Sequence, residues 1–394
     1  MKVDREQLLR DGFLILREVV PADQLEDMRR SYATLVERQG GEGWLGKGAQ
    51  PRLTVDPLIN ESTANAVEIW AGETTLGVAE QLMCCPDPGV MSMECMCNPL
   101  TDHGPSGWHR DINPNNFAPM DLLAKDMLAN GPRYLQWNIA LYEDSVFWVV
   151  PGSHRRLNTK EENASLRECE RVPLPDSIPV ELNAGDGVVY INFLLHWGSN
   201  YSTKMRRTLH GGHSIFTHQA DLSFMRHLAP WARELFARFD EQSAQKKDLT
   251  EAALRAAIDK DADAYWTAVE GLQPGADDNG KLVLTIYLSK TAYHAWILRH
   301  PEDNSPPDVT RDYANTIHSI TLNWGPNFCE RFSRSETDVL WQRFTPLDRT
   351  LQSNEEQLVP GYGSGWPRRP PMKYYIEEAL EGYQLDDFIA SWDA

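Results

Sequence analysis

Three residues whose side chains can bind a divalent metal ion lie in two segments that are far apart in the sequence. His109 and Asp111 are separated by a single residue. Because successive side chains of a strand point to opposite faces, both lie on one face if this segment is a strand. His196 ends a second apolar run much further along the chain. Two imidazoles and one carboxylate can occupy one face of an octahedron and leave three positions open, so the sequence predicts a metal site at His109, Asp111 and His196.

Two adjacent arginines, Arg206 and Arg207, follow His196 and indicate what such a metal would bind. The ligand set suits iron centres that take a bidentate co-substrate and dioxygen. The planar fork of an arginine binds a carboxylate through two parallel hydrogen bonds. A 2-oxo acid that chelates iron at one end would need such an arginine at its other end. Neighbouring side chains of a strand face opposite ways, so only one of the two arginines can point into the site.

Short strands must position these residues. Between Gly89 and Gly212, short apolar runs alternate with turn residues, a texture typical of a β-sandwich or barrel. The chain after about residue 219 has a helical texture, and a capping box that begins at Asp248 predicts a helix to about Leu272. The apolar, aromatic segment 282–299 fits a strand or a helix equally well.

Composition excludes several classes of partner. The 394-residue chain has 57 acidic and 38 basic side chains, a formal net charge of −19, which disfavours nucleic acid and anionic membrane surfaces. The sequence shows no signal peptide and no uninterrupted apolar run long enough to span a membrane. Its six cysteines lack the C-x-x-C spacing of zinc sites, so we expect free thiols in a reducing cytosol and a cytoplasmic protein.

The order of these motifs resembles the phytanoyl-CoA dioxygenase family of Fe(II)/2-oxoglutarate-dependent oxygenases. The resemblance covers roughly residues 5–215 and implies an α+β fold with a β-rich core, a double-stranded β-helix (a cupin-like jelly roll) with flanking N-terminal helices. We expect this core to occupy residues 1–218, and a mostly helical C-terminal extension, 219–394, to pack on it as a lid or an oligomer surface. The matching pieces are Asp11-Gly12-Phe13-Leu14-Ile15-Leu16, Trp108-His109-Arg110-Asp111, Trp148-Val149-Val150-Pro151-Gly152-Ser153-His154, Gly185-Asp186-Gly187, His196-Trp197-Gly198-Ser199-Asn200 and Arg206-Arg207-Thr208-Leu209.

The resemblance also assigns roles within the site. His109, Asp111 and His196 match the iron ligands, and the arginine after the distal histidine matches the one that binds the far carboxylate of 2-oxoglutarate. A count without a gap selects Arg207, whereas a one-residue deletion selects Arg206, which we favour. Gln136 and Asn138 alternate on one face of a strand that should line the barrel, where they either bind 2-oxoglutarate or substrate or make local hydrogen bonds.

The sequence therefore predicts an Fe(II)- and 2-oxoglutarate-dependent dioxygenase. It would use O2 to hydroxylate or otherwise oxidise an unactivated C–H bond of a small-molecule metabolite, with release of succinate and CO2. Two alternatives stay open: a cupin-like metal-dependent dioxygenase or isomerase that does not use 2-oxoglutarate, and a non-catalytic binding protein. The substrate, the oxidative outcome and the oligomeric state, including a homo-oligomer, are not fixed by the sequence.

Overall fold

The computed structural model describes residues 1–112, 118–216, 221–306, 308–318, 320–362, 372–374 and 382–393. Contacts divide the chain into two units. The first unit comprises Met1–Asp111, Pro132–Glu241 and Pro360–Arg369, and the second comprises Ile112–Gly131, Gln242–Val359 and Pro370–Ala394. The division differs from the boundary expected after residue 218, because a helix from within the predicted core groups with the second unit and residues 221–241 group with the first.

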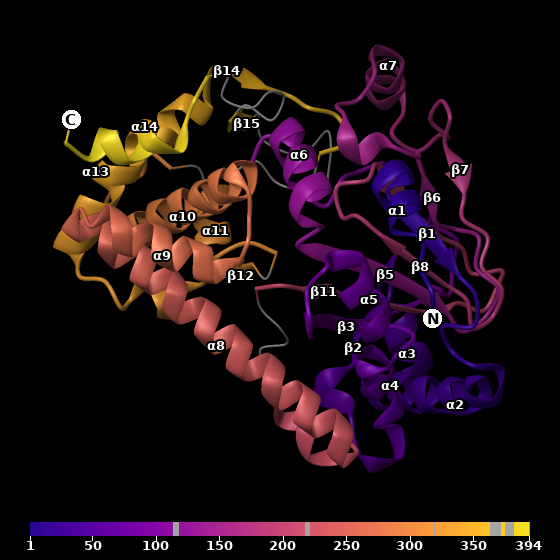
Figure 1. Ribbon diagram of the computed structural model, residues 1–394. Helices are drawn as coiled ribbons and strands as arrows, with labels where there is room; N and C mark the ends of the chain where they lie inside the picture. The colour runs from indigo at the N-terminus through magenta and orange to yellow at the C-terminus, as the bar shows by residue number, and fades with distance from the viewer. Residues whose placement is uncertain are drawn as a thin grey trace. The chain divides into compact units, whose positions relative to one another are not determined.

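The first unit is built on an antiparallel six-stranded sheet (Figure 1). Its strands lie in the order β1 (Phe13–Leu16), β8 (Gly187–Tyr190), β5 (Tyr134–Ala140), β11 (Arg207–Ser214), β3 (Gly89–Cys97) and β2 (Arg52–Thr54). Neighbours in the sheet are mostly distant in sequence, so the chain crosses over repeatedly. Each strand is short and apolar on at least one face, as the turn-punctuated sequence predicted.

Smaller sheets carry the remaining strands of this unit. One has the order β7 (Ile178–Pro179), β6 (Trp148–Val149) and β9 (His196–Trp197), and the other pairs β10 (Ser199–Asn200) with β4 (Gly104–Pro105). An isolated antiparallel bridge joins His109 to His196 and so links the segment after β4 to β9. All of these pairings are antiparallel as well.

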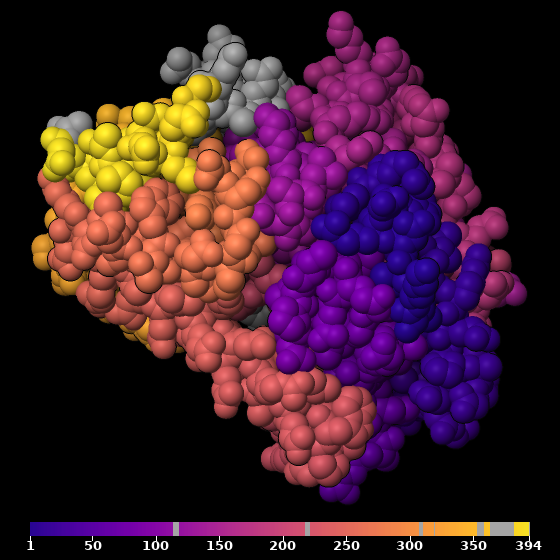
Figure 2. Space-filling view, viewed as in Figure 1, coloured from indigo at the N-terminus to yellow at the C-terminus, as the bar shows by residue number. Residues whose placement is uncertain are grey.

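Helices cover the outer face of the six-stranded sheet. The helices of the first unit are α1 (Arg5–Asp11), α2 (Ala22–Gln39), α3 (Gly41–Leu45), α4 (Asn65–Glu68), α5 (Leu76–Met83) and α7 (Lys160–Glu168). α5 packs against β5, and the fully buried Trp70 lies against His213 of β11 (Figure 1). In Figure 2 the N-terminal residues, in indigo and violet, form a continuous surface over this part of the unit.

The second unit is mostly helical. It contains α6 (Met120–Asn130), α9 (Ala262–Leu272), α10 (Asp278–Arg299), α11 (Asp308–Ala314), α12 (Pro326–Cys329), α13 (Arg334–Leu351) and α14 (Leu385–Ala390). Two short strand pairs, β12 (Ile317–His318) with β13 (Asn323–Trp324) and β14 (Gln352–Gln357) with β15 (Met372–Tyr374), complete it. These features confirm a mixed fold with antiparallel sheets and a helical C-terminal part. No helix among the described residues is both long and apolar enough to cross a membrane.

The sequence placed one helix start wrongly. α8 runs without a break from Pro230 to Asp259, so the capping box expected at Asp248 lies inside a helix, and a separate helix, α9, follows. Segment 282–299, which the sequence left undecided, is part of α10. All six cysteines are free thiols.

Buried histidines of the first unit make its stability depend on pH. Burial lowers the pKa of His154 and of His213 to about 4, although each ring bonds a backbone carbonyl. An unfolded histidine has a pKa near about 6.5. Between these values the unfolded state binds more protons than the folded state, so the free energy of unfolding rises with pH. Conversely, stability is lost as the pH falls from about 6.5 towards 4.

We therefore expect the unfolding free energy to fall by about 2–3 kcal/mol per pH unit near pH 5, from these two residues together. Urea unfolding at pH 7, 6 and 5 would measure the slope. His213→Gln should remove about half of it, whereas the exposed His103→Gln should leave it unchanged. An unfolding free energy that does not vary between pH 5 and 7 would contradict this interpretation.

Candidate metal centre

Backbone pairing brings His109 and His196 together. The amide of each donates to the carbonyl of the other, at N···O distances of 2.9 and 3.0 Å, and the two ring centroids lie 4.4 Å apart. Asp111 is fixed by Asn192, because its amide donates to the Asn192 carbonyl at 2.8 Å and the Asn192 amide group donates to the Asp111 carbonyl at 3.0 Å. The three predicted side chains therefore converge, with candidate ligand atoms all within 4.8 Å of one another.

Local hydrogen bonds orient both imidazoles towards the carboxylate. Nδ1 of His109 lies 2.9 Å from the Gly107 carbonyl, and Nδ1 of His196 lies 2.7 Å from the Leu194 carbonyl. A carbonyl can only accept, so Nδ1 carries the proton in each ring and Nε2 keeps its lone pair. The two Nε2 atoms lie 3.5 and 3.4 Å from the Asp111 carboxylate oxygens. This is the tautomer that metal-binding histidines require.

The charges of the site favour its metal-binding protonation states. Burial, followed by the neighbouring His196, lowers the pKa of His109. Burial acts to raise the pKa of Asp111, but His196, His109 and the Gln136 amide more than offset it, so its net pKa lies far below the usual value. A neutral imidazole and an ionised carboxylate are the forms that bind a divalent cation. The donor set, its tautomers and its charges thus fit iron.

Gln136 belongs to the same centre through Asp111. Its Nε2 donates to a carboxylate oxygen of Asp111 at 2.9 Å and lies 3.3 Å from Nε2 of His210. Nδ1 of His210 in turn lies 2.8 Å from the Asn138 side-chain oxygen. Gln136, Asn138 and His210 therefore share the inner face of the sheet, as their register across β5 and β11 requires. Asn138 contacts the network and does not bond Asp111 directly.

The hydrogen bond from Gln136 should hold the carboxylate of Asp111 in place for the metal. Gln136→Leu is expected to weaken Fe(II) binding about 10-fold to 100-fold, as loss of such a supporting bond does elsewhere. Anaerobic calorimetric titration with Fe(II) would measure the affinity. Asn138→Leu is the matched control, since it lies one bond further from Asp111, and it should change the affinity by less than about threefold. Equal losses in the two variants would contradict a specific role for Gln136.

Arg206 lies on the same inner face and is buried. Its Nε donates to Oδ2 of Asp144 at 2.9 Å, and the hydroxyl of Thr208 donates to that oxygen at 2.5 Å. Burial acts to raise the pKa of Asp144, but Arg206 and the hydrogen bonds outweigh it and lower the net pKa. Nη1 of Arg206 is buried and has no hydrogen-bond partner among the described residues. A polar atom in this state suits a ligand carboxylate.

Arg207 belongs to the opposite face of β11. Its Nη1 donates to the Asn98 side chain at 3.0 Å and to the backbone carbonyl of Arg206 at 2.7 Å. It pairs in register with Cys97 of β3, whereas Thr208 and His210 face the inner side. The alternation predicted for the two arginines is present, and Arg206 has the inward position.

Sequence reasoning missed several side chains of this inner face. Thr208 and His210 could have been found from their alternation with Arg206 along one apolar run. Arg52 and Glu94 form an ion pair at 3.2 Å, and Glu94 lies directly across from His210 in the sheet. Only the pairing of β2 with β3 reveals this contact, because no local pattern links residues so far apart.

Comparison with known proteins identifies the family. A family model described as phytanoyl-CoA dioxygenase (PhyH) matches residues 8–208, just over half of the 394-residue chain. The chain belongs to the phytanoyl-CoA dioxygenase family. It is thus a non-haem iron, 2-oxoglutarate-dependent oxygenase in type, and the matched span contains His109, Asp111, His196 and both arginines. The resemblance read from the sequence is confirmed.

Three solved structures illustrate the range of similar proteins. The non-haem α-ketoglutarate-dependent epimerase SnoN from nogalamycin biosynthesis is 17% identical, with 54% of this chain and 80% of that chain covered and a TM-score of 0.40. HygX from Streptomyces hygroscopicus, with nickel and 2-oxoglutarate bound, is 18% identical over 55% and 89%, with a TM-score of 0.41. EctD from S. alaskensis, with 2-oxoglutarate and 5-hydroxyectoine, is 15% identical over 54% and 75%, with a TM-score of 0.39. No curated protein sequence matches the chain significantly. The family match alone carries the assignment.

Proposed function

We propose that this oxygenase oxidises an unactivated C–H bond of a small-molecule metabolite, with O2 as the oxidant and with 2-oxoglutarate converted to succinate and CO2. The observation that carries the proposal is the convergence of His109, Asp111 and His196 from two distant segments. Arg206, with its unpartnered Nη1, lies on the inner face of the sheet that also carries Gln136. Hydroxylation is the simplest outcome of such a centre.

The proposed fold of the core is a double-stranded β-helix. Its support is the order of the strands: β3, β11, β5 and β8 are neighbours in one sheet, while β9 pairs with β6 and β10 pairs with β4 in the smaller sheets. Successive strands alternate between these two sets along the chain, from β3 to β4 and from β5 to β6. This alternation is what a jelly roll requires.

The chain's own residues would prepare the site for its two cofactors. When bound, iron and 2-oxoglutarate supply the oxidising chemistry. His109, Asp111 and His196 would hold the iron, and Arg206 would bind the far carboxylate of the co-substrate through Nη1 while its Nε edge stays on Asp144. The rings of Phe147 and Tyr190 lie 5.4 and 5.3 Å from the His196 ring and limit access of water to it.

Anaerobic titration with Fe(II) and then 2-oxoglutarate tests the proposal. We expect one iron per chain and a weak visible charge-transfer band that needs both components. Changes in this band across a panel of metabolites would identify the substrate, and the net charge of −19 favours neutral or cationic candidates. Turnover without 2-oxoglutarate would favour the cupin-like alternative. Failure to bind iron would favour a non-catalytic binding protein.

A further inference from the structure

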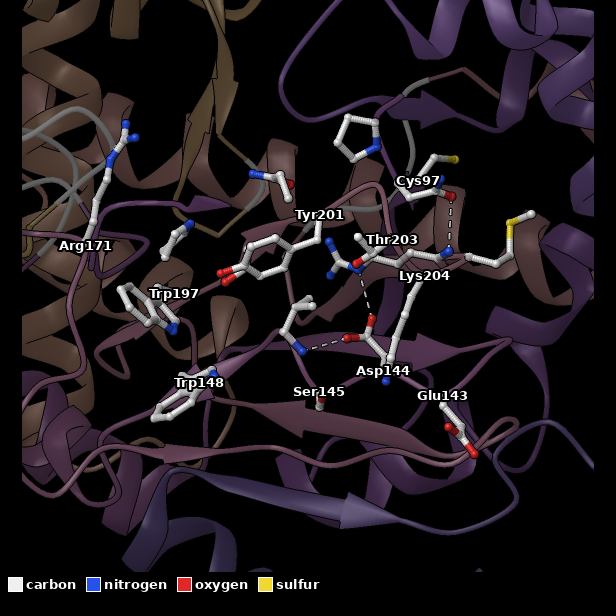
Figure 3. A pocket seen from close by; sticks show the side chains of 18 of the residues that line it. Cys97, Glu143, Asp144, Ser145, Trp148, Arg171, Trp197, Tyr201, Thr203 and Lys204 are labelled. Atoms are coloured by element: carbon white, nitrogen blue, oxygen red, sulfur yellow. Dashed lines mark hydrogen bonds and ion pairs between the residues drawn. The ribbon is translucent and has the colours of Figure 1, made fainter. Parts of the chain in front are cut away.

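A second cavity lies in the first unit beside Arg206 (Figure 3). It has a volume of about 430 Å³, and its walls come from the segments that follow β3, β5 and β10. The described lining residues include Arg206 and Asp144 and none of His109, Asp111 and His196. The cavity therefore reaches the guanidinium of the proposed co-substrate site from a side that does not contain the metal-binding side chains.

The floor of the cavity contains three buried polar atoms without a partner. Nη1 of Arg206, Nε1 of Trp197 and the side-chain oxygen of Asn200 make no hydrogen bond within the described part of the chain. These residues are only 8%, 3% and 6% exposed. Leaving a buried donor or acceptor unsatisfied costs about 1–3 kcal/mol each, so such groups are normally bonded. Two donors and one acceptor on one floor suit a ligand that has both an oxyanion and a hydroxyl.

The walls and rim of the cavity indicate the rest of the ligand. Trp148 and Trp197 pack edge to face with ring centroids 6.1 Å apart, and the exposed Tyr201 lines the same cavity (Figure 3). Lys204 and Arg171 are exposed at the rim with one acidic residue, Glu143, while Asp144 already pairs with Arg206. The lining thus has one positive charge in excess, although the whole chain is strongly acidic. Aromatic walls with a single excess positive charge suit a flat monoanion.

We propose that this cavity binds a flat, hydroxyl-bearing aromatic monocarboxylate at a site separate from the metal centre. The carboxylate takes hydrogen bonds from Arg206 and Trp197, the hydroxyl donates to Asn200, and the ring lies against the tryptophans. 2-Oxoglutarate itself does not match, because it has no flat apolar body for the aromatic walls. The proposal does not depend on iron binding or turnover, so its failure is distinct from failure of the proposed function.

Calorimetric titration with 6-hydroxy-2-naphthoate, without added metal, tests the site. We expect one molecule bound per chain, and at least about tenfold weaker binding of the methyl ester, which keeps the shape and loses the charge. Lys204→Gln should weaken binding about twofold to fivefold, because the lysine is exposed and its interaction is screened. Lys47→Gln, an exposed lysine of the same unit that does not line the cavity, should leave binding unchanged.

Two further measurements decide whether the site is separate. Asp111→Ala should bind the probe with unchanged affinity, and binding should persist at saturating 2-oxoglutarate, weakened by less than about tenfold because both ligands use Arg206. Complete displacement by 2-oxoglutarate would place the probe in the co-substrate site and overturn the proposal. The absence of saturable binding, or equal affinities for acid and ester, would overturn it as well.

Discussion

Replacing His109 by Ala is expected to lower the affinity for Fe(II) by at least about 1000-fold and to abolish 2-oxoglutarate-dependent turnover. The substitution removes one of three side chains whose candidate ligand atoms lie within 4.8 Å of one another. Asp111 and His196 alone would leave the cation with too few protein ligands to hold it against water. Anaerobic calorimetry with Fe(II), followed by the visible titration with 2-oxoglutarate, measures both losses.

The variant should keep its fold, which makes the loss interpretable. His109 joins the β structure through its backbone, by bonds of 2.9 and 3.0 Å with His196, and Ala retains both. Its ring makes one hydrogen bond to protein, to the carbonyl of Gly107. We therefore expect the urea midpoint to shift little. His103→Ala, in the preceding loop and exposed, is the matched control and should bind iron normally. Wild-type iron affinity in His109→Ala would refute the assigned ligand set.

The convergence of the metal-binding residues could be predicted because it depends on a two-residue repeat. His109 and Asp111 need only an extended backbone to share a face, and their type restricts the chemistry. The pairing of Arg206 with Asp144 could not be predicted in this way. Asp144 lies in the segment between β5 and β6, and its carboxylate reaches Arg206 from a position 62 residues earlier in the chain. No local pattern encodes that distance.

The helical errors have a similar cause. A capping box begins a helix only where the preceding residues are not helical, yet Gln242–Lys247 are mostly good helix formers and α8 simply continues through them. α10 resisted assignment because residues 282–292 are buried without a break, so no polar face marks a helical period. In both places packing, and not the local sequence, decides the structure.

Arg206→Gln is expected to weaken 2-oxoglutarate binding by at least about 100-fold, whereas Arg207→Gln should change it by less than about threefold. Arg206 lies on the inner face and has a buried, unpartnered Nη1, while Arg207 bonds Asn98 and its own backbone neighbour on the other face. Anaerobic titration of the iron-loaded variants with 2-oxoglutarate measures both affinities. If Arg207→Gln loses the affinity and Arg206→Gln keeps it, the one-residue deletion that aligns Arg206 with the family is wrong.

The stability of Arg206→Gln needs a second variant, because the substitution also strands a buried carboxylate. Asp144 is 7% exposed, and without the guanidinium its charge is only partly compensated by Thr208 and the Val146 amide. Removing one member of a buried ion pair costs about 3–5 kcal/mol. The double variant Arg206→Gln/Asp144→Asn removes both charges and should recover most of that stability in urea unfolding. It should still bind 2-oxoglutarate at least about 100-fold more weakly than the wild type, because the carboxylate has lost its cation whether or not the fold is intact.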